Sequence, residues 1–203
     1  MRAPATPSEI LVTLRDGSSV TVRPIRREDA AALRAGFERL SQESRYRRFL
    51  SPMPELGKPM LRYLTEVDHH DHEALVALGA DGTLVGVARS VRSCSDPHVA
   101  EAAVTVADDW QGRGLGTALL ELLADRARAE GISRFTALVL ASNREMLGLL
   151  EGLGPLRILE RGAGTIELEI TLPRRGTGPH LRELLRGSAS GRYTVITRQP
   201  AER

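Results

Sequence analysis

The sequence predicts an α/β fold in which a central mixed β-sheet is flanked by helices. Three features indicate it: β-rich runs occur in pairs joined by short turns, helical segments lie between some of the pairs, and one run, residues 135–140, is apolar apart from Thr136. An almost wholly apolar run of this length is typical of a strand buried on both faces. Because strands and helices do not alternate regularly, repeated βαβ units are not expected.

The first part of the chain predicts a hairpin followed by helices. Residues 10–14 and 19–25 are rich in β-branched side chains and flank Asp16-Gly17, a pair typical of a tight hairpin turn. Apolar residues then recur at helical spacing over residues 28–40. Two shorter helices are expected next, over residues 44–50 and, beyond a proline-rich break, over residues 56–67.

The rest of the chain predicts most of the sheet. Asp81-Gly82 marks a second hairpin turn, and Glu130-Gly131 is a typical end of a helix. The expected elements, in chain order, are strands over 74–78, 84–91 and 102–107, a helix over 115–130, a strand over 135–140, a helix over 143–152, and a closing hairpin of strands over 156–159 and 165–172.

Length and charge predict one domain and a basic tail. The chain has 203 residues, which suits a single domain with a small extension. Residues 1–172 carry 21 basic and 24 acidic side chains, whereas residues 173–203 carry seven Arg and two Glu. We expect a domain over 1–172 and a basic C-terminal tail over 173–203. A helix over 180–186 and a strand over 193–197 fit the tail, which can be a flexible extension, pack on the sheet edge, or contact a protein or nucleic acid.

Composition excludes several classes of protein. Seven aromatic residues offer few stacking surfaces, so nucleic acid is not an expected partner. A single cysteine, Cys94, excludes an intramolecular disulfide framework and any multi-cysteine metal site. No apolar run approaches the roughly 18 residues of a membrane span, and the first ten residues lack the apolar segment of a signal peptide. We therefore expect a cytoplasmic protein with no membrane contact.

The strongest functional motif is a glycine-rich loop between a predicted strand and a predicted helix. The loop contains Gly112, Gly114 and Gly116 and leads into the N-terminus of the predicted helix. Unpaired backbone N–H groups and the positive end of the helix dipole lie together at such a position, an arrangement that holds phosphate. No lysine follows these glycines, which excludes a Walker loop. The loop also begins too far beyond its strand for a typical dinucleotide fingerprint. A tight turn without a ligand is the remaining structural alternative.

This loop carries a family resemblance. Gln111-Gly112-Arg113-Gly114-Leu115-Gly116 matches the acyl-CoA signature Q/R-x-x-G-x-G/A, and on that motif the chain resembles the GNAT acetyltransferase superfamily. The apolar strand after the next helix and Asn143 beyond it fit the same pattern. The resemblance covers residues 19–172 and is strongest to the bacterial protein-lysine acetyltransferases that modify acyl-CoA synthetases.

The resemblance implies acetyl-CoA as cosubstrate and assigns roles to the loop and its neighbours. Backbone groups of the strand would pair with pantetheine in a gap where the sheet splays, and the loop N–H groups would surround the pyrophosphate, with the Arg113 guanidinium adding charge. Asn143 would reach the pantetheine arm. The implied cofactor-binding residues are Val104, Thr105, Val106, Gln111, Gly112, Arg113, Gly114, Gly116, Thr117 and Asn143.

The implied reaction is direct acetyl transfer to a primary amine, with a protein lysine as the expected acceptor. A protonated amine cannot attack a thioester, so a carboxylate must remove its proton. Glu101, just before the cofactor strand, is the expected base, and Glu73 is the next candidate. Many family members have a tyrosine acid where this chain has Leu150, so the acid is left open. The alternatives are a small-molecule amine acetyltransferase and a non-catalytic acyl-CoA sensor, and a homodimer is left open as the oligomeric state.

Three other features of the sequence were considered as functional sites. The run from Asp68 to Glu73 is rich in His and Asp, but its spacing argues against a metal site, and none is expected; His72 could assist proton transfer. Cys94 shows no nucleophile signature. A cluster of arginines in the second helix, Arg45, Arg47 and Arg48, is either a solvated face or a site for acidic substrates.

Overall fold

The computed structural model describes residues 9–173 and 197–198, and their strands form one mixed sheet. The strand order is β7-β8-β6-β5-β4-β3-β2-β1-β9. The strands are β1 (Glu9–Thr13), β2 (Ser19–Pro24), β3 (His72–Leu78), β4 (Leu84–Arg92), β5 (Val99–Val106), β6 (Arg134–Leu140), β7 (Leu156–Gly162), β8 (Thr165–Thr171) and β9 (Thr197–Arg198). The helices are α1 (Ala30–Arg39), α2 (Gln42–Phe49), α3 (Lys58–Thr65), α4 (Leu115–Ala129) and α5 (Arg144–Leu153), with 3-10 turns η1 (Arg27–Asp29) and η2 (Asp108–Trp110).

The mixed sheet flanked by helices confirms the predicted fold class. Three expectations about strands need correction: β7 continues to Gly162 rather than ending at residue 159, β6 is not buried on both faces because Leu138 is 50% exposed, and β5 begins earlier than expected. β5 begins at Val99 rather than at residue 102, because Val99 to Glu101 pair with β6. Glu101 therefore lies within the strand and not before it. In the predicted tail, Thr197 and Arg198 pair antiparallel with β1, whereas the helix expected over 180–186 and most of the strand expected over 193–197 lie outside the described residues.

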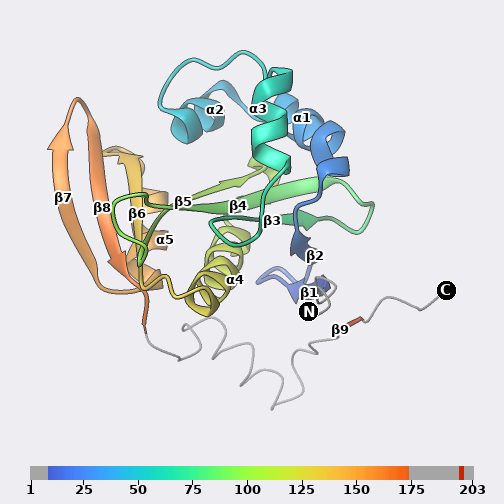
Figure 1. Ribbon diagram of the computed structural model, residues 1–203. Helices are drawn as coiled ribbons and strands as arrows, with labels where there is room; N and C mark the ends of the chain where they lie inside the picture. Colours follow the sequence, from blue (N-terminus) through green and yellow to red (C-terminus); the bar gives the residue numbers. More distant parts are fainter. Residues whose placement is uncertain (1–8, 174–196, 199–203) are drawn as a thin grey trace.

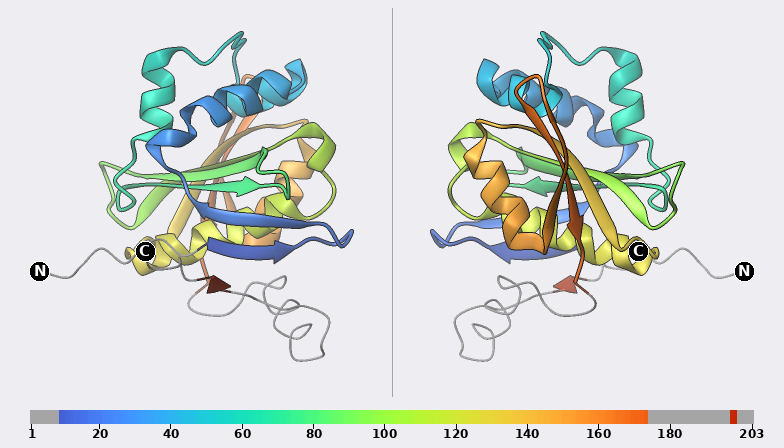
Figure 2. Two further views of the ribbon diagram at one scale, coloured as in Figure 1. Left: turned by 90° about the vertical axis from the view of Figure 1, so that its right-hand side faces the viewer. Right: turned by 90° about the vertical axis from the view of Figure 1, so that its left-hand side faces the viewer.

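The helices cover both faces of the sheet (Figures 1 and 2). Helices α1, α2 and α3 lie on one face over a core that includes Phe37 and Leu64, and α4 and α5 pack on the other. Leu119 and Leu123 of α4 are fully buried, and each such side chain stabilises the fold by roughly 1.5–3 kcal/mol. None of the described helices combines the length and apolar character needed to cross a bilayer.

The sheet splits between β5 and β6. This is the one parallel pair among the described strands, and it extends only from Val99–Glu101 to the facing residues of β6. Beyond Glu101, β5 remains paired with β4 alone, while β6, β8 and β7 turn away (Figure 1). The last part of β5 therefore has a free backbone edge on the side of β6.

Candidate active site

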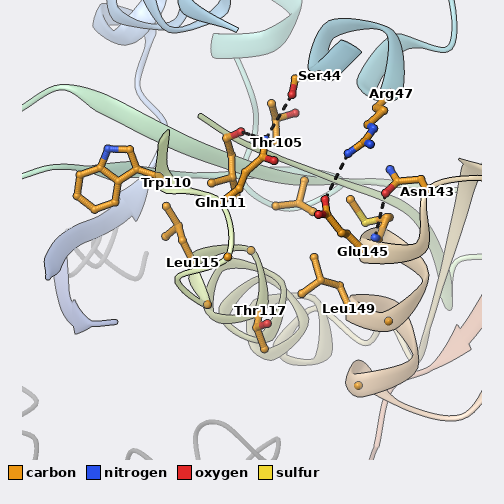
Figure 3. A pocket seen from close by; sticks show the side chains of 18 of the residues that line it. Ser44, Arg47, Thr105, Trp110, Gln111, Leu115, Thr117, Asn143, Glu145 and Leu149 are labelled. Carbon is orange, nitrogen blue, oxygen red and sulfur yellow. Dashed lines mark hydrogen bonds and ion pairs between the residues drawn. The ribbon is translucent and has the colours of Figure 1, made fainter. Parts of the chain in front are cut away.

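A cleft of about 570 Å³ opens where the sheet splits, between β5, the N-terminus of α4, and α5 (Figure 3). Its lining includes nine of the ten residues that the resemblance assigned to cofactor binding. These are Val104, Thr105, Val106, Gln111, Gly112, Gly114, Gly116, Thr117 and Asn143. Strand edge, glycine loop and capping residue are thus brought together at one place.

The loop favours glycine at each of its three positions, but for different structural reasons. Gly112 and Gly114 have φ angles of +73° and +90°, in the left-handed region that favours glycine. Gly116 has an ordinary backbone, but a Cβ atom there would lie 3.2 Å from Leu149 Cδ1 of α5. The loop therefore turns sharply into α4, and the space beside its N-terminal N–H groups stays open.

The Gln111 side chain holds the loop in place. Its Nε2 group donates to the carbonyl oxygen of Val106 at 3.2 Å and reaches Ser44 Oγ and Asp108 Oδ1 at 3.3 Å. Asp108 also accepts a hydrogen bond from the Ser41 backbone N–H at 2.7 Å. Burial alone would raise the pKa of Asp108, but the hydrogen bonds from Ser44 and Ser41 outweigh it and lower that pKa. This network joins the loop to the start of α2.

The Arg113 side chain lies outside the cleft lining. Its guanidinium group donates to Asp16 Oδ2 at 3.1 Å and to the Asp109 carbonyl oxygen at 2.5 Å, and it stacks 4.9 Å from the centre of the Trp110 ring. Its backbone remains part of the glycine loop. The guanidinium charge is therefore directed to the β1–β2 turn and not into the cleft.

Asn143 is the N-cap of α5 and is buried at the cleft wall. Its Oδ1 atom accepts a hydrogen bond from the Met146 backbone N–H at 3.1 Å, which caps the helix. The Nδ2 group has no hydrogen-bond partner among residues 9–173. That group is consequently available as a donor on the cleft side.

Glu101 lies on β5 ahead of the cleft, with an exposed side chain. Ala100 and Ala102 are buried in the core beneath α4, so the alternation of a strand places Glu101 on the face of α1–α3. Arg48 of α2 lines the cleft, and its pKa is lowered by burial, an effect that the nearby Glu101 carboxylate opposes. An exposed carboxylate and a half-buried guanidinium thus lie at one end of the cleft.

Comparison with known proteins identifies the family. Residues 35–154 match the model of the Acetyltransferase (GNAT) family. The chain belongs to this GNAT family. Acetyltransferase Pat from Mycolicibacterium smegmatis is 36% identical over 177 residues, which is 87% of this chain and 53% of that protein. The chain therefore spans about half the length of that relative.

Two other similar proteins are matched over a larger share of their own length. An acetyltransferase from Pseudomonas aeruginosa is 39% identical over 145 residues, 70% of this chain and 77% of that protein. The crystal structure of the GNAT domain of S. lividans PAT superposes with a TM-score of 0.75 at 35% identity, over 81% of this chain and 97% of that one. The GNAT fold is therefore shared along nearly the full length of a solved GNAT domain.

Glu73 and His72, the other residues considered for proton transfer, are already engaged. Glu73 is buried on the α4 face, where Arg126 Nε donates to it at 2.5 Å and His69 bonds to it at 2.7 Å. Burial and then the neighbouring Arg89 charge lower the pKa of His72 to about 4. His72 Nε2 also lies 2.7 Å from an Arg89 nitrogen, so its lone pair is occupied.

The remaining sequence features do not form a second site in the described part of the chain. Leu150, where many GNAT proteins have tyrosine, is 2% exposed and packs in the core below the cleft. Asp68 accepts three backbone hydrogen bonds and so stabilises a turn. No three His, Cys, Asp or Glu side chains within residues 9–173 are grouped to hold a metal. Cys94 is exposed.

Sequence reasoning missed several cleft residues that come from distant segments. Arg15 comes from the β1–β2 turn and Ser44 from α2. Arg47 of α2 forms an ion pair of 3.3 Å with Glu145 of α5, which spans the cleft in Figure 3. The arginine cluster of α2 was the only sequence feature that pointed to this side of the cleft. No sequence motif indicates that α2 and α5 lie on opposite sides of one cleft.

Proposed function

We propose that this chain transfers an acetyl group from acetyl-CoA to the side-chain amine of a protein lysine, by direct attack in a ternary complex. One observation carries the proposal: the free edge of β5 runs from the glycine loop toward Glu101. A single extended ligand lying along that edge would have its phosphates at the loop and its thioester near the carboxylate.

The cleft supplies groups suited to each part of acetyl-CoA. The unpaired edge at Val104 to Val106 supports pairing with the pantetheine amides, as when a peptide adds a strand to a sheet. The N–H groups of Gly112, Arg113, Gly114, Gly116 and Thr117 at the start of α4 suit the pyrophosphate. The Nδ2 group of Asn143 suits a pantetheine carbonyl.

Glu101 is the proposed base. A lysine amine has a pKa near 10.4 and arrives protonated, so Glu101 takes one proton, directly or through water. The neutral nitrogen attacks the thioester carbon and the C–N bond forms. The nitrogen then releases its second proton to water as the C–S bond breaks. The departing CoA thiolate, with a thiol pKa of about 8.5, is protonated by water, since Leu150 provides no acid.

The surroundings of Glu101 favour a protein acceptor over a small amine. The Glu101 side chain is exposed on a strand face that α1–α3 leave partly open, and Leu138 on neighbouring β6 is 50% exposed. A second cavity, between α1–α3 and the sheet, has a volume of only about 60 Å³, roughly that of two waters. An extended lysine side chain reaches such an open site without needing an enclosing pocket.

Replacement of the base tests the proposal. We expect Glu101→Gln to lower kcat by about 100-fold or more, because general-base catalysis is worth 10²–10⁴. The measurement is CoA release with lysine-containing protein acceptors. The matched control is Glu28→Gln, an exchange at an exposed position of η1 outside the cleft lining, with the dissociation constant of acetyl-CoA measured for each variant. Equal kcat in wild type and Glu101→Gln would remove Glu101 as the base.

The acceptor is tested by incubating the protein and acetyl-CoA with a cell lysate and mapping new acetylation by mass spectrometry. Acetylation of the protein's own lysines contributes little background, because Lys58 is the only lysine of the chain. The variant Lys58→Arg removes this background. New acetyl-lysines that disappear with Glu101→Gln support the proposal. Acetylated small amines alone would favour the small-molecule alternative, and acetyl-CoA binding without turnover would favour a sensor.

A further inference from the structure

The phosphate end of the cleft lacks the cation that the motif was expected to provide. Acetyl-CoA carries a pyrophosphate and a 3′-phosphate, whereas backbone N–H groups and a helix dipole supply only partial charges. The Arg113 guanidinium is held by Asp16, the Asp109 carbonyl and the Trp110 ring. Turning it into the cleft would break all three contacts.

Arg15 places a positively charged side chain at the phosphate end of the cleft. It follows β1 in the hairpin turn, and its backbone N–H donates to the Arg113 carbonyl oxygen at 3.2 Å. Its side chain lies against the glycine loop, since a Cβ atom placed on Gly114 would be 3.4 Å from Arg15 Cγ and Nε. Arg15 lines the cleft, and its guanidinium has no ion pair or hydrogen bond with any described residue.

The turn that carries Arg15 is fixed by Arg113. Asp16 accepts hydrogen bonds from the Ser18 hydroxyl and backbone N–H, and these bonds, with a smaller effect of Arg113, lower its pKa. The Arg113–Asp16 ion pair and the bond from the Arg15 N–H hold the hairpin on the loop from two points. The same ion pair neutralises the one carboxylate of the turn, which would otherwise repel a phosphate.

We infer that Arg15 binds a phosphate group of acetyl-CoA and that Arg113 acts as a positioning residue for the hairpin that carries it. The inference rests on the proposed function, because it assigns a ligand for the same cofactor. A guanidinium and a phosphate form charge-assisted, often bidentate hydrogen bonds, which gives Arg15 a role in selecting CoA over shorter pantetheine thioesters.

Calorimetric titration with three probes tests the inference: acetyl-CoA, 3′-dephospho-acetyl-CoA and acetyl-pantetheine. We expect Arg15→Gln to weaken acetyl-CoA binding by about 10- to 100-fold, the range of a lost charge-assisted hydrogen bond, and to leave acetyl-pantetheine unchanged. If the loss persists with the 3′-dephospho probe, Arg15 binds the pyrophosphate; if it vanishes, Arg15 binds the 3′-phosphate. Arg15→Lys should recover part of the affinity.

The control is Arg34→Gln, which removes the same charge from the exposed surface of α1, outside the cleft lining. Arg113→Gln should weaken acetyl-CoA less than Arg15→Gln does. Equal dissociation constants for wild type and Arg15→Gln, or an equal loss with acetyl-pantetheine, would overturn the inference. A wild-type protein that binds no acetyl-CoA would instead overturn the proposed function, so the two failures are distinct.

Discussion

Gly114 illustrates how one backbone angle governs the glycine loop. Its φ of +90° lets the chain turn into α4, and its bare Cα leaves room for the Arg15 side chain. An L-residue at such an angle is destabilised by roughly 1–2 kcal/mol. A side chain here would change both the stability of the loop and the space in which the proposed phosphate would lie.

We therefore expect Gly114→Ala to lower the free energy of unfolding by about 1–2 kcal/mol and also to weaken acetyl-CoA binding. Gly131→Ala is the matched control, because Gly131 has a similar φ of +81° but follows the other end of α4. Urea titration should show similar destabilisation of the two variants, and calorimetry should show weaker binding for Gly114→Ala alone. Equal affinities would contradict the placement of the phosphate at this loop.

A buried ion pair links η1, the turn just before α1, to the sheet. Arg23 of β2 donates two hydrogen bonds of 2.7 Å to Asp29 of η1, and both side chains are about one-tenth exposed. Burial alone would raise the pKa of Asp29, but the bonds from Arg23 and from the Arg26 backbone N–H outweigh it and lower that pKa. The pair thus fixes the point at which the helices on that face of the sheet begin.

Asp29→Asn should lower the free energy of unfolding by about 3 kcal/mol, because the buried Arg23 then keeps only the longer ion pair of 3.8 Å with Glu9. Since the folded pKa of Asp29 lies below its unfolded value, its contribution is complete above about pH 4 and is lost as the pH falls through the folded pKa. Urea titrations between pH 7 and pH 3 should show the two proteins converging.

Glu66→Gln, which removes the exposed partner of Arg27, provides a comparison and should change stability by less than about 0.5 kcal/mol. If Asp29→Asn were equally mild at pH 7, the buried pair would not be what anchors α1.

At the scale of the whole molecule, the split between β5 and β6 divides the sheet into two parts. Strands β6, β8 and β7 lie on one side of it, and the remaining strands lie on the other. Sheet backbone without a strand partner exchanges its amide hydrogens readily, and a ligand that pairs with it protects them. In this protein the unpaired edge lies on β5 beyond Glu101.

Hydrogen exchange followed by mass spectrometry should detect this pairing. We expect saturating acetyl-CoA to slow exchange in residues 102–106 and in the glycine loop. β3 serves as the internal control, since it is paired on both sides by β2 and β4 and should change little. Unchanged exchange in residues 102–106 despite acetyl-CoA binding would show that pantetheine does not pair with β5.

Much of the fold could be predicted because its signals are local. Helical spacing of apolar residues, the Asp16-Gly17 and Asp81-Gly82 turns and the apolar run of β6 each depend on neighbours in the chain. The boundary of β5 was predicted three residues late, since its first residues are held by β6 and that pairing has no local signature.

The same division holds for the site. The glycine loop and Asn143 were recognisable because a φ above zero and an N-cap each demand particular residues at fixed positions. Local chemistry could not show that Arg113 turns to Asp16 while Arg15 turns to the cleft. Both orientations follow from the packing of a hairpin on a loop about a hundred residues later in the chain.

The sequence thus determined the helices, the strands and the glycine loop, because these depend on backbone angles and on periodicity within a few residues. The open edge of β5 was implied only by the family resemblance, whereas tertiary structure alone decided the position of Glu101 within the strand and which arginine faces the cleft. Those features arise where distant segments pair or pack, and the free energy that selects them belongs to contacts that no single segment contains.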